Sequence, residues 1–229
     1  MSVDLPTLAP SAPVLTRGQH LRAFLDMWLK DHGFIRDIYC NIHPVAEGVW
    51  RSAQPAPHHL RWAKRQGIRT ILNLRGRRDT CGSYILERQE CERQGLILVD
   101  FPIRSRSPLD KDTLRAAGQL FGQIEYPMLM HCKSGADRAG LMATLYLFLH
   151  EGMPLRQAMG QLSLAYGHLK HAKTGVIDFF FEQYLAAAEA RPMTFYQWVD
   201  QIYDRDALEA QFKENWLAGI LINQILRRE

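Results

Sequence analysis

The residues best suited to chemistry lie together in the segment 131–138, which reads His-Cys-Lys-Ser-Gly-Ala-Asp-Arg. Cys132 carries a thiol that can act as a nucleophile. Arg138 follows with five residues between them, and its planar guanidinium can hold two oxygens of one phosphate group. A short apolar stretch precedes the segment, and the apolar stretch 137–150 follows it. The pattern therefore predicts a strand, a loop that carries the chemistry, and a buried helix.

A loop between a strand and a helix N-terminus directs several backbone N–H groups inward, and the helix dipole adds positive charge there. Gly135 allows a sharp turn because it has no Cβ. The helix end and the Arg138 guanidinium both favour the thiolate form of Cys132. We therefore predict that the thiolate attacks phosphorus and forms a phosphocysteine, which water then hydrolyses. The predicted phosphate-binding residues are Lys133, Ser134, Gly135, Ala136 and Arg138.

This loop resembles the signature of the protein-tyrosine and dual-specificity phosphatase superfamily, which has His-Cys, five variable residues and Arg. The wider resemblance runs from about residue 45 to residue 184, and its segments 50–55 and 67–75 are similar to parts of bacterial dual-specificity-like members. The resemblance implies a phosphotyrosine phosphatase-like fold and a Cys-dependent phosphatase of the protein-tyrosine phosphatase type. It also implies that His131 holds the loop in shape.

The resemblance further implies a general acid that protonates the leaving oxygen, and many relatives carry this aspartate on a loop before the cysteine. The corresponding stretch, 101–110, has arginines and serines instead. Asp137 precedes Arg138 directly, as in bacterial phosphatases with a Lys-Asp-Arg loop, and it is our predicted acid. The alternative is that Asp137 only complements the helix dipole. Asp110 is the reserve acid, although its place also suits a helix cap. Ala139 stands where many relatives have a Ser or Thr that assists the second step.

Basic residues follow two predicted strands at the edge where open α/β sheets bind ligands. Arg75 and Arg77 follow one strand and Arg104 follows the next, so they are candidate substrate-binding residues for a multiply charged phosphate. The alternative is that they lie in solvated loops. His168 and His171 are interpreted as ordinary surface or core histidines.

Strand-like and helix-like segments alternate after position 44, which predicts an α/β fold with a mostly parallel central sheet flanked by helices and extra helices at both termini. We expect an N-terminal arm and helix at 1–44, a Cys-dependent phosphatase domain at 45–190, and a C-terminal helical extension at 191–229 that packs on the same domain. The predicted strands are 45–50, 68–74, 96–101 and 127–131, and the predicted helices are 58–66, 84–94, 111–124, 137–150, 155–165 and 176–188.

The two ends of the chain carry further helical patterns. Residues 1–13 are expected to form a loose arm, and the apolar face of the helix 19–30 is predicted to pack on the core. The alternative is an amphipathic helix that lies on a membrane, with its basic residues facing anionic lipid. That apolar face is Leu21, Phe24, Leu25, Trp28 and Leu29, and those basic residues are Arg17, Arg22 and Lys30. A C-terminal helix that opens near Asp206 has the apolar face Leu208, Phe212, Trp216, Ile220 and Leu221.

The composition is typical of a globular protein, because 47% of the 229 residues are hydrophobic and 23% are charged. The net charge of +4 suits a phosphorylated substrate, which would be a protein, a small molecule or a lipid, and basic clustering typical of nucleic-acid binding is lacking. Four cysteines without CxxC or Cys/His spacing favour reduced thiols, a cytoplasmic location and no metal site. We expect no signal peptide and no membrane-spanning segment.

The predicted chemistry needs no cofactor, and the sequence leaves the oligomeric state open. Three other functions compete with a protein-tyrosine phosphatase. One is a phosphoinositide or other lipid-phosphate phosphatase on the same scaffold. Another is a phosphate-binding pseudophosphatase, which the alanine at position 139 and the missing upstream aspartate keep open. The third is sulfur transfer, against which His131 and Arg138 argue.

Overall fold

A central sheet organises the protein in a computed structural model that describes residues 6–226, with side chains described except at 37 and 217–226. The sheet order is β1–β5–β4–β6–β3–β2. Neighbours β5, β4, β6 and β3 pair in parallel, whereas β1 and β2 pair antiparallel at the two edges. This confirms the mostly parallel sheet. The strands are β1 (Thr7–Leu8), β2 (His43–Ala46), β3 (Val49–Ser52), β4 (Thr70–Asn73), β5 (Ile97–Asp100) and β6 (Met128–His131).

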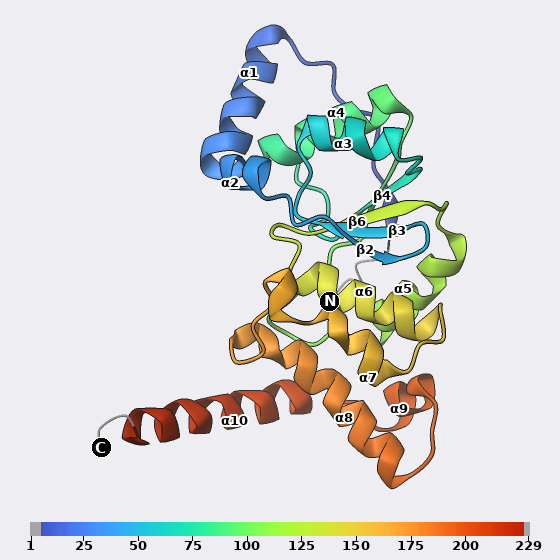
Figure 1. Cartoon of the computed structure of the whole chain (residues 1–229), viewed down its shortest axis with the longest axis vertical. Helices are drawn as coiled ribbons and strands as arrows, with labels where there is room; N and C mark the ends of the chain where they lie inside the picture. The colour runs from blue at the N-terminus through green and yellow to red at the C-terminus, as the bar shows by residue number, and fades with distance from the viewer. Residues whose placement is uncertain (1–5, 227–229) are drawn as a thin grey trace.

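Helices cover both faces of the sheet and form a three-layer structure (Figure 1). On one side lie α1 (Arg17–Leu25), α2 (Gly33–Ile38), α3 (Pro57–Arg65) and α4 (Gly82–Gln94). On the other lie α5 (Lys111–Gln123), α6 (Asp137–Leu149), α7 (Leu155–Ala158), α8 (Val176–Ala190), α9 (Phe195–Gln201) and α10 (Arg205–Leu226). The central strands β4 and β6 are buried at every residue, as expected when helices cover both faces of a parallel sheet.

Two apolar clusters, one on each face, hold the layers together. The larger packs the sheet against α5, α6, α8 and α9 and includes Phe121, Phe181 and Trp198. The smaller packs it against α3 and α4 and includes Leu60 and Ile71. Burial of this apolar surface is the main stabilising contribution, at about 25 cal/mol per Å².

Three local predictions were wrong. The strand 45–50 is instead a hairpin of β2 and β3, because Gly48 turns the chain with φ +69°. Part of the loose arm is ordered as β1, which pairs with β5. The helix 155–165 ends at Ala158 and continues as short 3₁₀ turns, since Gly160 and Ser163 favour helix poorly.

The prediction that the apolar face of the helix 19–30 packs on the core was also wrong. The helix begins at a capping box formed by Thr16 and Gln19, and a π-helical turn, Asp26–Lys30, extends it. Only Ala23 and Met27 are buried, whereas the larger apolar residues are exposed. A Cβ on Gly82 would lie 2.1 Å from the carbonyl oxygen of Ala23, so α1 touches the start of α4 with its backbone. So close an approach admits only small side chains on the inner face.

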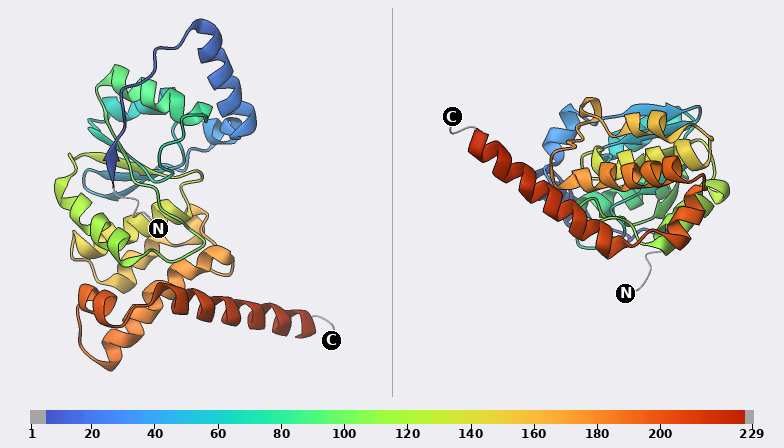
Figure 2. Two further views of the ribbon diagram at one scale, coloured as in Figure 1. Left: turned by 180° about the vertical axis from the view of Figure 1, so that it is seen from behind. Right: turned by 90° about the horizontal axis from the view of Figure 1, so that it is seen from below.

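The C-terminal helix α10 begins against α8 and then projects from the body of the protein (Figure 2). Leu208 is buried and Phe212 packs on the larger cluster. Trp216 donates a hydrogen bond from Nε1 to the backbone oxygen of His171 at 3.1 Å. Ile220 and Leu221, from the same predicted face, lie outside the described side chains. Within residues 6–226, no helix has the length and apolar character needed to cross a membrane.

Candidate active site

Cys132 lies at the carboxyl edge of the sheet, directly after β6. Its backbone N–H donates to the oxygen of Ser52, at the end of β3, at 3.4 Å, and its side chain is buried. The loop after Cys132 leads straight into α6, which begins at Asp137. The predicted order of strand, loop and buried helix is confirmed.

The loop backbone has the shape of an anion cradle. Gly135 has φ +75°, and a Cβ there would lie 2.7 Å from the backbone nitrogen of Ala53. Only glycine fits both the conformation and the space. Within the part of the chain that the structure describes, no backbone hydrogen bond uses the N–H groups of Lys133, Ser134, Gly135, Asp137 or Arg138. These donors at a helix N-terminus suit a phosphate group.

Arg51, on β3, fixes the shape of this loop from below. Its Nη2 donates to the backbone oxygens of Gly135 and Ala136 at 2.7 and 2.8 Å. Its Nη1 donates to the backbone oxygen of Gln161 at 2.6 Å, and its guanidinium lies 4.4 Å from the ring centre of Tyr166. The side chain is fully buried. Turning these carbonyls toward Arg51 leaves the adjacent N–H groups directed into the loop.

Two guanidinium groups act on the thiol of Cys132. Burial lowers the pKa of Arg51 to about 10, and the charges of Cys132, Tyr166 and Asp137 act in the opposite direction. Burial likewise lowers the pKa of Arg138, and the charge of Cys132 again opposes the shift. Arg138 is half-buried and its Nη1 donates to the backbone oxygen of Leu74 at 3.3 Å. Arg51 and Arg138 therefore both place positive charge beside Cys132.

A buried histidine holds the predicted acid, Asp137. Nδ1 of His168 lies 2.7 Å from Oδ1 of Asp137, and Nε2 lies 2.7 Å from Oδ2 of Asp178. Burial alone would lower the pKa of His168, but hydrogen bonds and charges from both carboxylates raise it to about 9. At neutral pH His168 is therefore an imidazolium that donates to both. This differs from the sequence interpretation of His168 as an ordinary histidine.

His131 is fully buried behind the loop. Its Nε2 lies 2.7 Å from Oε1 of Glu87 on α4, and the other carboxylate oxygen, Oε2, accepts a 2.7 Å hydrogen bond from Nε2 of Gln54. Glu87 is buried too, so the pair links β6 to α4 in the interior. The arrangement gives His131 a fixed position next to Cys132.

Arg75 lies in a buried ion cluster, away from solvent. Its Nη1 and Nη2 donate to the two carboxylate oxygens of Asp31 at 2.7 and 2.9 Å. Burial disfavours the charge of Asp31, but hydrogen bonds from Arg75 and Ser83 hold its pKa well below the ordinary value. Lys133, in the loop, has its Nζ 3.3 Å from Oδ1 of Asp31. Arg75 therefore supports the loop through Asp31. Its side chain is buried, whereas a substrate-binding role at the edge of the sheet would need it to be accessible.

The remaining predicted residues lie on the surface or at helix ends. Arg77 is exposed and its Nε donates to Asp79 at 2.6 Å, and Arg104 is exposed as well. Asp110 caps α5, because its Oδ1 accepts from the backbone N–H of Thr113 at 2.7 Å. The predicted helix cap at Asp110 is confirmed. Its carboxylate is engaged by this contact, which makes Asp110 a weaker candidate for the general acid.

Sequence reasoning missed Arg51, His168, Asp178, Asp31 and Gln54. Arg51 lies one residue beyond the predicted strand 45–50, so the sequence held no signal that its charge is buried in β3. His168 had none, since its partners lie at distant positions and only folding brings them together. Among the described residues, no group of three or more His, Cys, Asp or Glu side chains is arranged to hold a metal ion.

Comparisons with known proteins give the family and the fold. A family model described as a DSP-PTPase phosphatase fused to NAD+ kinase matches residues 43–176. The crystal structure of Pseudomonas aeruginosa TpbA superimposes with a TM-score of 0.50 at 20% identity, over 75% of this chain and 90% of that one. The active form of Tk-PTP gives a TM-score of 0.49 at 19% identity, over 63% and 98%. A search of curated proteins found no match.

Proposed function

Since the chain belongs to the DSP-PTPase phosphatase family, in the branch described as fused to NAD+ kinase, we propose that it hydrolyses phosphomonoesters through a cysteinyl-phosphate on Cys132. One observation carries the proposal. The thiol lies at the base of a loop whose N–H groups are available, whose carbonyls are turned away by Arg51, and whose far end carries Arg138. These groups stabilise the three equatorial oxygens of a phosphoryl group in transfer.

In the first step, the Cys132 thiolate attacks phosphorus. An S–P bond forms while the bond from phosphorus to the ester oxygen breaks, and Arg138 holds two of the phosphoryl oxygens. The departing oxygen takes a proton and leaves as an alcohol or phenol. The proton comes from the hydrogen-bonded pair of Asp137 and His168, which lies at the same end of α6 as the loop.

The acid is best described as a coupled pair. His168 brings a proton to within 2.7 Å of the Asp137 carboxylate, and Asp178 holds the opposite nitrogen. The proton on His168 can therefore move along this hydrogen bond to Asp137. Asp137 faces solvent with 26% of its side chain, whereas the His168 side chain is fully enclosed. The proton of His168 therefore passes through Asp137 to the leaving oxygen, and the pair is left as a neutral imidazole and a carboxylate.

In the second step, water attacks the phosphocysteine, the S–P bond breaks, and inorganic phosphate and the thiolate are released. The Asp137 carboxylate accepts a proton from the attacking water and returns it to His168, which restores the imidazolium. Ala139 is buried and offers no hydroxyl to the leaving thiolate. Ser134 is the exposed hydroxyl of the loop, and its Oγ accepts from the N–H of Ala136 at 3.4 Å. We propose that the Ser134 hydroxyl assists the leaving thiolate in place of the hydroxyl that Ala139 lacks.

The substrate is a phosphomonoester that reaches the loop from solvent. The family relationship alone favours phosphotyrosine in a protein. The exposed apolar surface of α1 and α2 is a feature of this chain and favours a lipid phosphate instead. A cytoplasmic location with reduced thiols suits both substrates, because the nucleophile must stay unoxidised.

Hydrolysis of an aryl phosphate tests the reaction itself. We expect turnover by the wild-type protein and none by Cys132→Ser, which keeps the loop and retains phosphate binding. Cys91→Ala is the matched control, because Cys91 is buried among apolar residues of the opposite face. Turnover by Cys132→Ser at a rate near that of the wild type would rule out the mechanism, and equal loss in Cys91→Ala would point to misfolding.

A further inference from the structure

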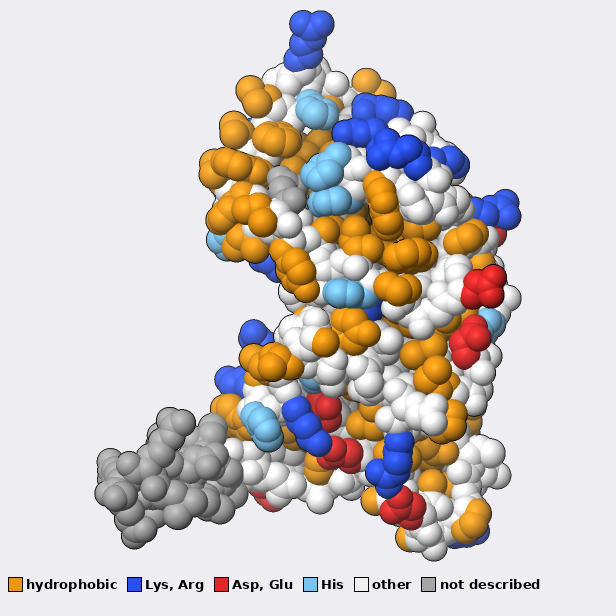
Figure 3. Space-filling view, viewed as in Figure 1, with side chains coloured by type: hydrophobic (Ala, Val, Ile, Leu, Met, Phe, Trp, Pro, Cys, Tyr) orange, Lys and Arg blue, Asp and Glu red, His pale blue; other side chains and the backbone are white. Residues whose placement is uncertain are grey.

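The N-terminal corner of the protein carries an unusual share of exposed apolar surface. Of the fourteen large hydrophobic side chains exposed among the described residues, nine lie between positions 21 and 39. In Figure 3 they gather on one lobe beside the hollow that separates it from the lower half of the molecule. The nine are Leu21, Phe24, Leu25, Trp28, Leu29, Phe34, Ile35, Ile38 and Tyr39, and we refer to them as the apolar corner. Patches of this kind mark binding surfaces.

Packing fixes the apolar corner in its outward direction. The carbonyl of Ala23 touches the backbone of α4 at Gly82, and Oδ2 of Asp26 accepts from the N–H of Gly82 at 2.7 Å. Met27 is buried beside them. Rotation of α1 would break all three contacts, so the large apolar side chains cannot turn inward.

The exposed charged side chains that the structure describes on this part of the chain are all basic. The exposed charged side chains described between positions 15 and 40 are Arg17, Arg22 and Lys30. Asp26 is partly buried and engaged by Gly82 and Lys30, and Asp31 is buried in its ion cluster. Apolar side chains ringed by arginine and lysine match a membrane surface that contains anionic lipid.

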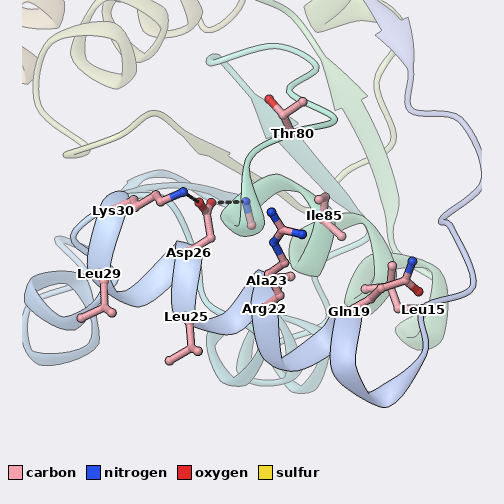
Figure 4. Close-up of a pocket in the computed structure, with 11 residues that line it drawn as sticks. Leu15, Gln19, Arg22, Ala23, Leu25, Asp26, Leu29, Lys30, Thr80 and Ile85 are labelled. Carbon is pink, nitrogen blue, oxygen red and sulfur yellow. Dashed lines mark hydrogen bonds and ion pairs between the residues drawn. The ribbon is translucent and has the colours of Figure 1, made fainter.

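A groove beside the apolar corner adds room for lipid. It lies between α1 and the start of α4 and has a volume of about 520 Å³ (Figure 4). Leu15, Leu25, Leu29 and Ile85 supply apolar lining. Arg22 and Lys30 supply positive charge along the same groove. An acyl chain and an anionic headgroup would each find suitable contacts there.

Residues within and directly after the segment that forms the apolar corner contact the catalytic loop. Asp31, between the π-helical turn and α2, pairs with Lys133 at 3.3 Å. Asn41, just after α2, donates from Nδ2 to the backbone oxygen of Ser134 at 2.9 Å. A surface bound to the apolar corner is therefore held close to the loop that carries Cys132.

We propose that the apolar corner docks on a membrane containing anionic lipid and that the substrate is the phosphate headgroup of a lipid in that membrane. The substrate part rests on the proposed phosphatase function, whereas docking is independent of turnover. Leu25 and Leu29 enter the acyl region, and Arg22 and Lys30 contact the headgroups. The lipid phosphate then reaches Cys132 without leaving the membrane surface.

Vesicle flotation with the full chain tests docking without catalysis. The Cys132→Ser protein is mixed with vesicles of phosphatidylcholine alone or with phosphatidylglycerol added. We expect binding to the anionic vesicles that weakens at high salt, and at least about tenfold weaker binding when Leu25→Gln and Leu29→Gln are added. The matched control is Leu8→Gln with Ile202→Gln, two exposed apolar residues elsewhere, and it should bind like the parent.

Three results would overturn docking on a membrane. The first is that the protein does not bind anionic vesicles, and the second is that the Leu25/Leu29 variant binds as well as its control. The third is that the protein sediments as a dimer and only the Leu25/Leu29 variant sediments as a monomer. The last would show that a second copy covers the apolar corner.

The substrate part has its own readout in the active protein. With Leu25→Gln and Leu29→Gln, we expect hydrolysis of a vesicle-borne lipid phosphate to fall about tenfold while kcat/KM for a soluble aryl phosphate stays within twofold. An equal fall with both substrates, or preference for a phosphotyrosine peptide over the vesicle-borne lipid, would overturn it. Inactivity toward every phosphate ester would instead reject the proposed function and leave docking standing.

Discussion

Replacing His168 by Gln removes the cation between Asp137 and Asp178, and the structure gives the size of the effect. Folding raises the pKa of His168 from 6.5 to about 9. A raised histidine pKa stabilises the fold fully below pH 6.5, and that contribution disappears as pH rises through about 9. The difference corresponds to a stabilisation on the order of 3 kcal/mol.

Urea denaturation at pH 6 and at pH 9.5 measures this contribution. The wild-type protein should lose on the order of 3 kcal/mol of unfolding free energy between the two pH values. His168→Gln, combined with Asp178→Asn so that no buried carboxylate is left unpaired, should lose much less. His171→Gln is the control, because His171 is exposed. Equal pH dependence in the wild-type protein and the double variant would refute the assignment of His168 as a buried cation.

The same variant has a kinetic signature. Without His168 the Asp137 carboxylate has no proton donor beside it, so kcat for a substrate with a poor leaving group should fall by about 10² to 10⁴. Hydrolysis of an aryl phosphate with a good leaving group should change little, since a good leaving group needs no proton. An equal loss with both substrates would mean that His168 only holds the structure.

Two further predictions concern the catalytic loop. Arg51→Lys keeps the charge but cannot reach the carbonyls of Gly135 and Ala136 together. The value of kcat/KM for aryl phosphate should therefore fall about a hundredfold, with little loss of folding. Unchanged kinetics would exclude a positioning role for Arg51. Gly135→Ala should lower the free energy of unfolding by at least about 1 kcal/mol and reduce turnover strongly, because its φ is +75° and its Cβ would meet Ala53. Gly122→Ala, in the open part of α5, is the control and should be neutral or stabilising.

The catalytic loop and the sheet were predictable from sequence because their signals are local. Cys132, Gly135 and Arg138 are close in sequence, and β4, β5 and β6 lie in short, mostly apolar segments of the chain. The edge strands were harder to predict. β1 has only two residues, so no periodicity marks it.

Contacts between distant segments could not be predicted in the same way. His168 meets Asp137 only because the turns after α7 return to the start of α6, and no spacing in the chain encodes that return. Two helices and three strands separate Arg75 and Asp31 along the chain. The apolar periodicity of 19–30 correctly indicated a helical face, but the close contact at Gly82 decides that this face points to solvent.

The central claim is that Cys132 becomes covalently phosphorylated during turnover. Rapid acid quenching of the wild-type protein with a phosphorus-labelled aryl phosphate, followed by peptide mapping, tests it directly. We expect label on the peptide that contains Cys132 and none in Cys132→Ser. Asp137→Asn should accumulate more label, because it lacks the base of the second step. Full turnover without label on Cys132, or label on another residue, would contradict the account.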